Sequence, residues 1–322
     1  MKNIDHPLSN WIPYKLVEKD NDVYFEWIYL GDLKYADPFF DETISKCRKN
    51  EYNSKRFKAV SSVDNVIDWS AGLDSIALKS LVFHVSRCGS TMLSQSLATS
   101  SENIMISEAP IIDEILRSDS LGLDKKTALL KAVFIFLGQK RFPEQKNLII
   151  KLDAWHIFNA DYLRSIFTEI PFGLLYRKPI EVLKSHQKMI GMHMVPNLLP
   201  PSVFGITAKE INDISFQQYS ALVLEKYLEG FASFYGTDQN VTLLNYNEGM
   251  RNVIEKFVSF INVDYSAEEL EKMYERLKKH SKNESAVFEG DSFKEEKLEI
   301  DFTAVNKSYE KLGNTLIEQF ES

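Results

Sequence analysis

Residues 81–97 constrain the fold of this chain more than any other segment. The first six of them, Leu-Val-Phe-His-Val-Ser, have the composition of a buried strand, and residues 90–97 have that of a helix. A loop of small residues, 86–91, joins the two. A strand that restarts as a helix after such a loop presents several backbone N–H groups in one direction, and with the helix dipole they favour an anion. We therefore predict a phosphate-binding loop here.

Strands and helices alternate through the rest of the chain. We predict strands at 148–152, 172–176 and 241–246, and helices at 127–138, 161–170, 180–189, 215–234, 252–261 and 267–279. This alternation predicts an α/β fold, a three-layer sandwich whose central parallel sheet carries helices on both faces. Ligands of such sheets bind beyond the C-terminal ends of the strands, so we look for functional residues there.

The first 75 residues follow another pattern. Apolar-rich stretches at 11–17 and 23–30 flank the turn-forming residues 19–22, which predicts a β-hairpin. Pro38-Phe39-Phe40 opens a predicted helix that runs to about Arg48, and residues 50–70 are polar and predicted to be irregular. We predict a small N-terminal α+β accessory unit at 1–75 and the main domain at 76–322.

Composition excludes several classes of function. The net charge of −8 argues against broad nucleic-acid binding. Two distant cysteines give neither a disulfide framework nor a zinc site, and no acidic metal-binding cluster stands out. The strongest apolar run, 128–137, is interrupted by Lys131 and is too short to span a bilayer. We expect a soluble cytoplasmic protein without a metal.

The loop departs from the Walker A pattern, GxxxxGK[ST], at its most important residue. With Gly89 as the second glycine, Ser90 stands where the lysine belongs and His84 where the first glycine belongs. Without the lysine, ATP or GTP hydrolysis loses its main contact to the γ-phosphate. Arg87 instead offers a planar, permanently charged group that suits phosphate or sulfate, and Thr91 adds a hydroxyl. A glycine turn with structural serines is the alternative.

Residues 83–93, Phe-His-Val-Ser-Arg-Cys-Gly-Ser-Thr-Met-Leu, resemble the phosphosulfate-binding loop of sulfotransferases that use 3′-phosphoadenosine 5′-phosphosulfate (PAPS). That family commonly carries R-x-G-[ST]-T in place of a full Walker A motif, on a P-loop sheet like that of nucleotide kinases. The resemblance implies donor-binding roles for Ser86, Arg87, Cys88, Gly89, Ser90, Thr91 and Met92.

Residues 174–186 resemble the second half of the same signature. In that family an arginine at a strand end and a serine in the next helix hold the 3′-phosphate of the donor, and Arg177 and Ser185 have that spacing. Pro179 suits a first helical turn, which puts Ser185 about two turns along the helix. A receptor for the 3′-phosphate separates a PAPS enzyme from an ATP enzyme. Because R-x-P before a helix is weak as a lone motif, the two motifs carry the assignment together.

Sulfuryl transfer needs a base for the acceptor and positive charge for the leaving oxygen. Protein-tyrosine and bacterial members of the family use a glutamate shortly after the phosphate helix, and the resemblance implies that role for Glu108. An ordinary helix N-terminal residue is the alternative. Arg87 and Lys151 are the candidate charges at the leaving group. Lys151 lies in an apolar strand, where a lysine needs a partner because burying it alone is costly.

Several other residues compete for roles at the site. His186 and His193 are alternative bases, since cytosolic members of the family use a histidine, and Asp153 is a lesser candidate. His84 lies inside the buried strand and is assigned a structural role. Lys282 is a candidate phosphate contact, in a loop that often closes over the nucleotide in that family.

The resemblance covers residues 79–285 and implies a PAPS-dependent sulfotransferase. It implies a hydroxyl or amine on a small-molecule or peptide acceptor, and no metal. A P-loop kinase using ATP and magnesium and a non-catalytic nucleotide-binding protein are the alternatives. Residues 1–75 have no counterpart in the family core, so they are expected to shape acceptor binding or to form a homodimer. Residues 191–201 either line the acceptor pocket or only connect two elements.

Overall fold

The computed structural model describes residues 6–19, 22–54, 57–281, 283–287, 298 and 300–321, with side chains outside 283–287 and 314–321. The chain forms two compact units. The first unit comprises Met1–Leu81, Ser94–Leu152 and Ala267–Arg276. The second unit comprises Val82–Leu93, Asp153–Ser266 and Leu277–Ser322.

A five-stranded sheet of order β5-β6-β4-β7-β8 is the centre of the fold. Its strands are β4 (Leu78–His84), β5 (Asn103–Ser107), β6 (Asn147–Lys151), β7 (Phe172–Tyr176) and β8 (Val241–Asn245). β5 and β6 are parallel, as are β7 and β8. Every residue of β5, β6 and β7 is buried, because helices cover both faces of a parallel sheet. The predicted α/β class with a central parallel sheet is confirmed, and β5 is a strand that we had not predicted.

Helices follow the strands as the alternation predicts. They are α3 (Ser90–Leu97), α4 (Pro110–Arg117), α5 (Leu123–Leu137), α6 (Ala160–Ile166), α7 (Pro179–Lys188), α8 (Phe216–Tyr235), α9 (Met250–Phe260), α10 (Ala267–Leu277) and α11 (Thr303–Glu321). Short 3₁₀ turns lie at Ala154–Asn159, Met192–Met194, Pro201–Phe204 and Tyr246–Glu248. β9 (Lys279–His280) and β10 (Asn283–Val287) form an antiparallel pair. The residue before α8, Ser215, accepts a hydrogen bond from the backbone N–H of Gln218 (3.1 Å), the usual helix N-cap.

The N-terminal residues of the first unit form a second, antiparallel sheet of order β1-β2-β3. It consists of β1 (Trp11–Lys19), β2 (Asp22–Tyr29) and β3 (Ala59–Ser62), accompanied by α1 (Phe40–Cys47) and α2 (Val63–Trp69). The predicted hairpin and first helix are confirmed. The prediction that residues 50–70 are irregular is wrong, because Ser61 pairs with Phe25 in the sheet and Ser62 caps α2 through the N–H of Asn65. The domain boundary near residue 75 stays a prediction.

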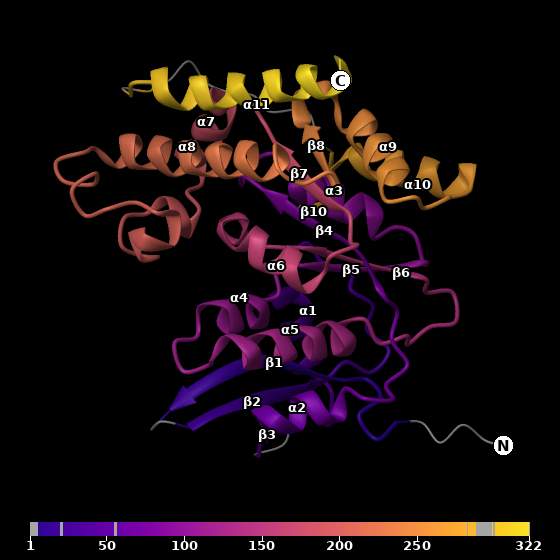
Figure 1. Cartoon of the computed structure of the whole chain (residues 1–322). Helices are drawn as coiled ribbons and strands as arrows, with labels where there is room; N and C mark the ends of the chain where they lie inside the picture. Colours follow the sequence, from indigo (N-terminus) through magenta and orange to yellow (C-terminus); the bar gives the residue numbers. More distant parts are fainter. Residues whose placement is uncertain are drawn as a thin grey trace. The chain divides into compact units, whose positions relative to one another are not determined.

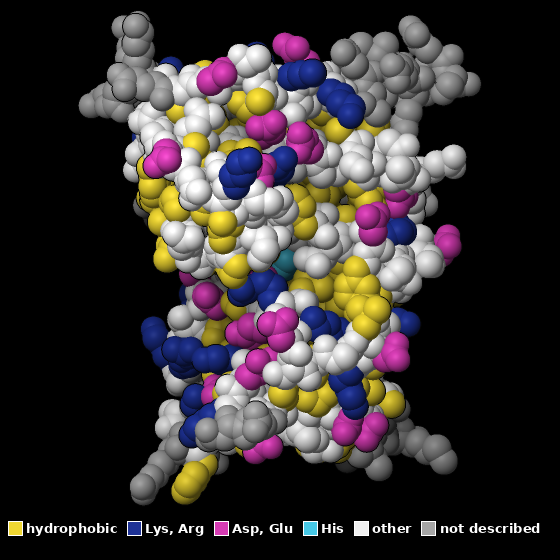
Figure 2. Space-filling model, turned by 60° about the vertical axis from the view of Figure 1, so that its left-hand side comes forward, with side chains coloured by type: hydrophobic (Ala, Val, Ile, Leu, Met, Phe, Trp, Pro, Cys, Tyr) yellow, Lys and Arg dark blue, Asp and Glu magenta, His cyan; other side chains and the backbone are white. Residues whose placement is uncertain are grey.

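In the second unit α8 and α11 pack side by side, as Figure 1 shows. Val305 and Leu312 of α11 are buried. Figure 2 shows acidic and basic side chains interspersed over one face of the molecule, with apolar patches between them. Within the part of the chain that the structure describes, every helix is too short or too polar to cross a membrane.

Candidate functional site

The loop between β4 and α3 has an unusual backbone. Ser86, Arg87 and Gly89 have φ angles of 63°, 48° and 87°, in the left-handed region that non-glycine residues seldom adopt. One hydrogen bond on the strand side holds this turn: the N–H of Ser86 donates to Nδ1 of His84 (3.0 Å). The structural role expected for His84 is therefore to fix the start of the loop. The turn lets α3 begin at Ser90 directly after the strand.

Gly89 packs closely against the Tyr246 ring. A Cβ at this position would be 2.4 Å from Cδ2 of Tyr246 and 3.1 Å from Sδ of Met250, so only glycine fits. We had not predicted a role for Tyr246, which we took as the last residue of a strand. It is the first residue after β8, and the rule that ligands bind beyond strand C-termini would have marked it.

The side chains of the loop divide into inward and outward groups. Cys88, Ser90 and Met92 are buried, and the thiol of Cys88 donates to the carbonyl oxygen of Leu175 (3.3 Å). These residues can reach a ligand mainly through the backbone. Arg87 is partly exposed, and its Nη2 donates to the carbonyl oxygen of Met189 (2.6 Å).

Arg177, the first residue after β7, packs against the phosphate loop. Its Nη1 donates to the carbonyl oxygen of Arg87 (3.4 Å), and its guanidinium carbon lies 4.1 Å from the centre of the Tyr246 ring. Only 5% of the residue is exposed. The two motifs, some ninety residues apart in the sequence, thus meet within the second unit.

A carboxylate also holds Arg177. Oε2 of Glu181, one turn along α7, accepts from Nε of Arg177 (2.6 Å). Asn247 donates to both carboxylate oxygens of Glu181 (3.0 and 3.1 Å) and accepts from the N–H of Lys178 (3.0 Å). Ser185 lies farther along α7 and is half-buried. An anion that binds to Arg177 must therefore share it with Glu181, a partner that we had not predicted.

The first unit contains a second cluster, at the ends of β5 and β6. The N–H of Glu108 donates to the carbonyl oxygen of Lys151 (2.8 Å), and Oε1 of Glu108 lies 2.9 Å from Nζ of Lys151. The approach is not aligned for a hydrogen bond, so the contact is an ion pair. Lys151 has 0% exposure, and its Nζ lies 5.2 Å from the centre of the Phe39 ring.

The Glu108–Lys151 pair supplies the partner that a buried lysine requires. We had assigned the two residues separate roles, so their pairing is new information. Glu108 also has a left-handed backbone, with φ 55°. Strain of this kind is found where surrounding contacts fix a side chain in one direction, which suits a residue that must be held in place.

His186 is poorly suited to be a base. It is buried, and its Nδ1 accepts from the N–H of Gly191 (3.2 Å). Burial, with the neighbouring His193 ring and the Arg87 guanidinium acting in the same direction, lowers the pKa of His186 to about 2. The ring is therefore neutral with its proton on Nε2, and neither nitrogen is available to accept a proton.

The remaining candidates lie as follows. His193 is buried between aromatic rings, with its centroid 5.6 Å from that of His186 and 5.8 Å from that of Trp155. Asp153 begins a 3₁₀ turn, and its carboxylate is 4.0 Å from Nε2 of His156. Lys282, the predicted phosphate contact, lies outside the described residues.

No family model and no curated protein sequence matches the chain. Among solved structures it is similar to the sulfotransferase domain from the curacin biosynthetic pathway, with 15% identity and a TM-score of 0.44, covering 75% of this chain and 98% of that one. A sulfotransferase from Alicyclobacillus acidocaldarius has 10% identity and a TM-score of 0.37, with 63% and 94% covered. Mouse sulfotransferase SULT7A1, complexed with PAP, has 13% identity and a TM-score of 0.36, with 69% and 72% covered. Similarity at this level does not establish a common family.

Proposed function

We propose that this protein is a sulfotransferase that moves a sulfuryl group from PAPS to a hydroxyl or amine. One observation carries the proposal. The loop between β4 and α3 has a left-handed backbone and no Walker lysine, and Arg177, at the end of the neighbouring strand β7, packs against it. Ser90 stands at the lysine position, so the loop lacks the contact on which ATP hydrolysis depends. A second arginine beside the loop suits a donor with a further phosphate.

The donor is consumed in the reaction and is therefore a substrate. We assign its 5′-phosphosulfate to the start of α3, where the first turn of a helix favours an anion. Arg177 and Ser185 would receive the 3′-phosphate. Arg87 would exchange the carbonyl oxygen of Met189 for an oxygen of the donor, because a charged oxygen is the stronger acceptor.

The proposed step is an in-line displacement at sulfur. The acceptor oxygen or nitrogen forms a bond to sulfur as the bond from sulfur to the 5′-phosphate oxygen breaks, and adenosine 3′,5′-bisphosphate departs. Glu108 takes the proton of the acceptor, and Lys151 orients the carboxylate of Glu108. The Arg87 guanidinium neutralises charge that develops on the leaving oxygen.

A thermal-shift comparison tests the donor class. Adenosine 3′,5′-bisphosphate at saturating concentration should raise the melting temperature by several degrees, since a ligand that binds only the folded state stabilises it. ATP with magnesium should change the melting temperature little, and 5′-AMP should give an intermediate rise. Stabilisation by ATP with magnesium alone would support a kinase and overturn the proposal.

The 3′-phosphate assignment has its own test. Arg177→Ala should remove the preference for adenosine 3′,5′-bisphosphate over 5′-AMP, because a charge-assisted contact to that phosphate is lost. Arg251→Ala is the matched control, since Arg251 pairs with Glu255 on the exposed side of α9 (3.0 Å). A preference that survives in Arg177→Ala would show that Arg177 serves only to hold Glu181.

A further inference from the structure

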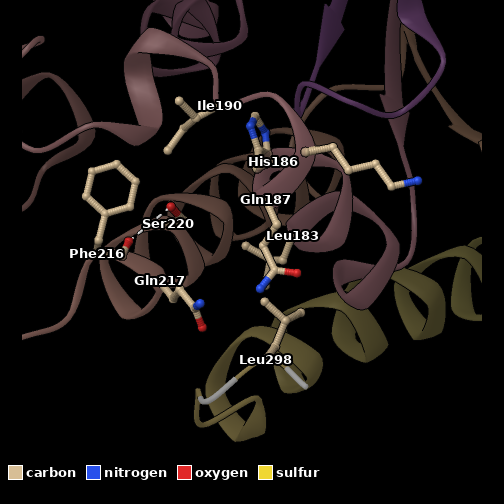
Figure 3. Close-up of a pocket in the computed structure, with 9 residues that line it drawn as sticks. Leu183, His186, Gln187, Ile190, Phe216, Gln217, Ser220 and Leu298 are labelled. Atoms are coloured by element: carbon tan, nitrogen blue, oxygen red, sulfur yellow. Dashed lines mark hydrogen bonds between the residues drawn. The ribbon is translucent and has the colours of Figure 1, made fainter. Parts of the chain in front are cut away.

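A cavity of about 500 Å³ lies in the second unit between α7 and α8. Phe216 and Gln217 of α8 face Leu183 and Gln187 of α7 across it, and Leu298 lies at one end (Figure 3). Cavities of roughly 300–1,000 Å³ are the usual size for small-molecule sites. The space is therefore large enough for a molecule of two or three rings.

Two apolar side chains of the lining are also exposed to solvent. Ile190 and Phe216 line the cavity and are 41% and 45% exposed. Met189, the sequence neighbour of the lining residues Lys188 and Ile190, is 60% exposed. Exposed apolar side chains that gather at a cavity indicate that an apolar ligand covers them.

One polar group in the lining lacks a protein partner. His186 is 3% exposed, and among the described residues its Nε2 has no hydrogen-bond partner. Because Nδ1 accepts from Gly191, the neutral ring carries its proton on Nε2, which is therefore a donor. A buried donor without an acceptor costs free energy, so an acceptor oxygen on a ligand would be favoured here.

We propose that this cavity binds an apolar molecule that carries one hydroxyl or carbonyl oxygen, and that the Nε2–H group of His186 donates to that oxygen. The ligand is mainly apolar, because the lining residues other than Lys188 are apolar or carry amide, hydroxyl and imidazole groups. His186 is thus a specificity residue and takes no part in proton transfer.

The cavity also borders the phosphate loop. Arg87 donates to the carbonyl oxygen of Met189, and Met189 lies between the lining residues Lys188 and Ile190. An apolar alcohol in the cavity is therefore the acceptor class that we infer for this protein. This last step rests on the proposed sulfuryl transfer, whereas the binding site itself does not.

Calorimetric titration with two ligands of the same skeleton tests the site without any donor present. Tetralin is apolar throughout, and 1-tetralone adds a single carbonyl oxygen. The informative quantity is the ratio of the two dissociation constants in the parent protein and in His186→Phe. In His186→Phe, loss of one hydrogen bond should weaken 1-tetralone relative to tetralin about three- to tenfold. An unchanged ratio would overturn the role of His186.

A second pair of variants keeps the test independent of how well His186→Phe folds. Gln217→Trp should fill the cavity and weaken binding of both ligands at least about tenfold, because the apolar site is then blocked. Glu229→Trp adds the same side chain to α8 at an exposed position away from the lining and should leave binding unchanged. Equal binding in Gln217→Trp and the parent protein would place the ligand elsewhere and overturn the site.

Turnover of 1-tetralol with PAPS separates the two proposals. Formation of its sulfate ester in the parent protein and its loss in Gln217→Trp supports the acceptor assignment. Ligand binding with the predicted ratio but without transfer keeps the site and overturns only the assignment of its ligand as acceptor. A failed nucleotide response together with intact tetralone binding would contradict the sulfotransferase proposal alone.

Discussion

Gly89 is the residue of the phosphate loop that tolerates least change. Its φ of 87° strains any other side chain, and a methyl group would be 2.4 Å from the Tyr246 ring. We predict that Gly89→Ala lowers the free energy of unfolding by about 1–3 kcal/mol and weakens binding of adenosine 3′,5′-bisphosphate at least about tenfold, because loop and ring must both move. Urea unfolding and nucleotide titration measure the two effects.

Gly72→Ala is the matched control for this substitution. Gly72 has φ 78°, but a Cβ there meets nothing within 4 Å. It should show the cost of the left-handed backbone alone, with nucleotide binding unchanged. Equal nucleotide affinity in the two variants would mean that the Gly89 turn is not part of the binding loop.

The Glu108–Lys151 pair predicts a separation between stability and activity. Glu108→Gln leaves a fully buried ammonium without its carboxylate, which should cost about 3 kcal/mol, since breaking one side of a buried pair is expensive. Lys151→Met added to Glu108→Gln removes that charge and should restore much of the stability. Sulfuryl transfer should stay absent in both variants if Glu108 is the base. Transfer by the stable double variant would exclude Glu108 from the chemistry.

His186 predicts a pH dependence of stability. Its pKa is about 2 in the folded chain against about 6.5 unfolded, so the unfolded chain binds the extra proton between these values. Stability should therefore fall as the pH falls below 6.5, by about 1.4 kcal/mol per pH unit from this group. His186→Gln should flatten the curve of unfolding free energy between pH 6.5 and about 4. An equal slope in the parent protein and in His186→Gln would contradict the prediction.

At the scale of elements, the sequence predicted those helices and strands whose signals lie within a short stretch of the chain. β7 was predicted with the bounds that it has, and α3 and the hairpin were found, because runs of apolar residues, turn residues and caps lie within a few positions of each other. β3, α2 and α11 were not found. α11 is mostly polar. β3 exists because β2 offers it a pairing edge, which no window of sequence contains.

In the candidate site, too, some residues could be predicted from the sequence and their partners could not. The strand end and the glycine predicted Arg87 and Gly89, and the resemblance to the sulfotransferase signature predicted Arg177, which lies where β7 stops. The partners were not predictable. Glu181 holding Arg177, and Glu108 holding Lys151, depend on side-chain directions that only the folded chain fixes.

The last helix offers a test at this scale. Leu312 of α11 is fully buried, and α11 packs along α8. Leu312→Ala should lower the free energy of unfolding by about 2–5 kcal/mol, from lost burial and the cavity that remains. Lys311→Ala, its exposed neighbour, should change stability by less than about 0.5 kcal/mol. Similar values for the two in urea unfolding would mean that α11 does not contribute to the fold.

At the scale of the molecule, the N-terminal sheet and the following helices form one core. Trp27 of β2 meets Phe136 of α5 edge to face, with ring centroids 4.8 Å apart. The N–H of Leu16 in β1 donates to Oε2 of Glu114 in α4 (2.6 Å). Gln139 accepts from the N–H of Asn10 and donates to the carbonyl oxygen of Trp11. The first unit therefore joins residues 1–81 to 94–152 through apolar and polar contacts.

This shared core predicts the result of separating the chain at residue 75. A fragment of residues 76–322 would expose Phe136, which Trp27 of β2 now contacts, and the carboxylate of Glu114, which now accepts from Leu16 of β1. A large exposed apolar face promotes aggregation. We expect the fragment to be insoluble or to unfold without a cooperative transition. Phe136→Ala in the full chain should cost about 3–5 kcal/mol through the same contact. A soluble fragment that unfolds cooperatively at the melting temperature of the full chain would instead establish residues 1–75 as a separate accessory unit.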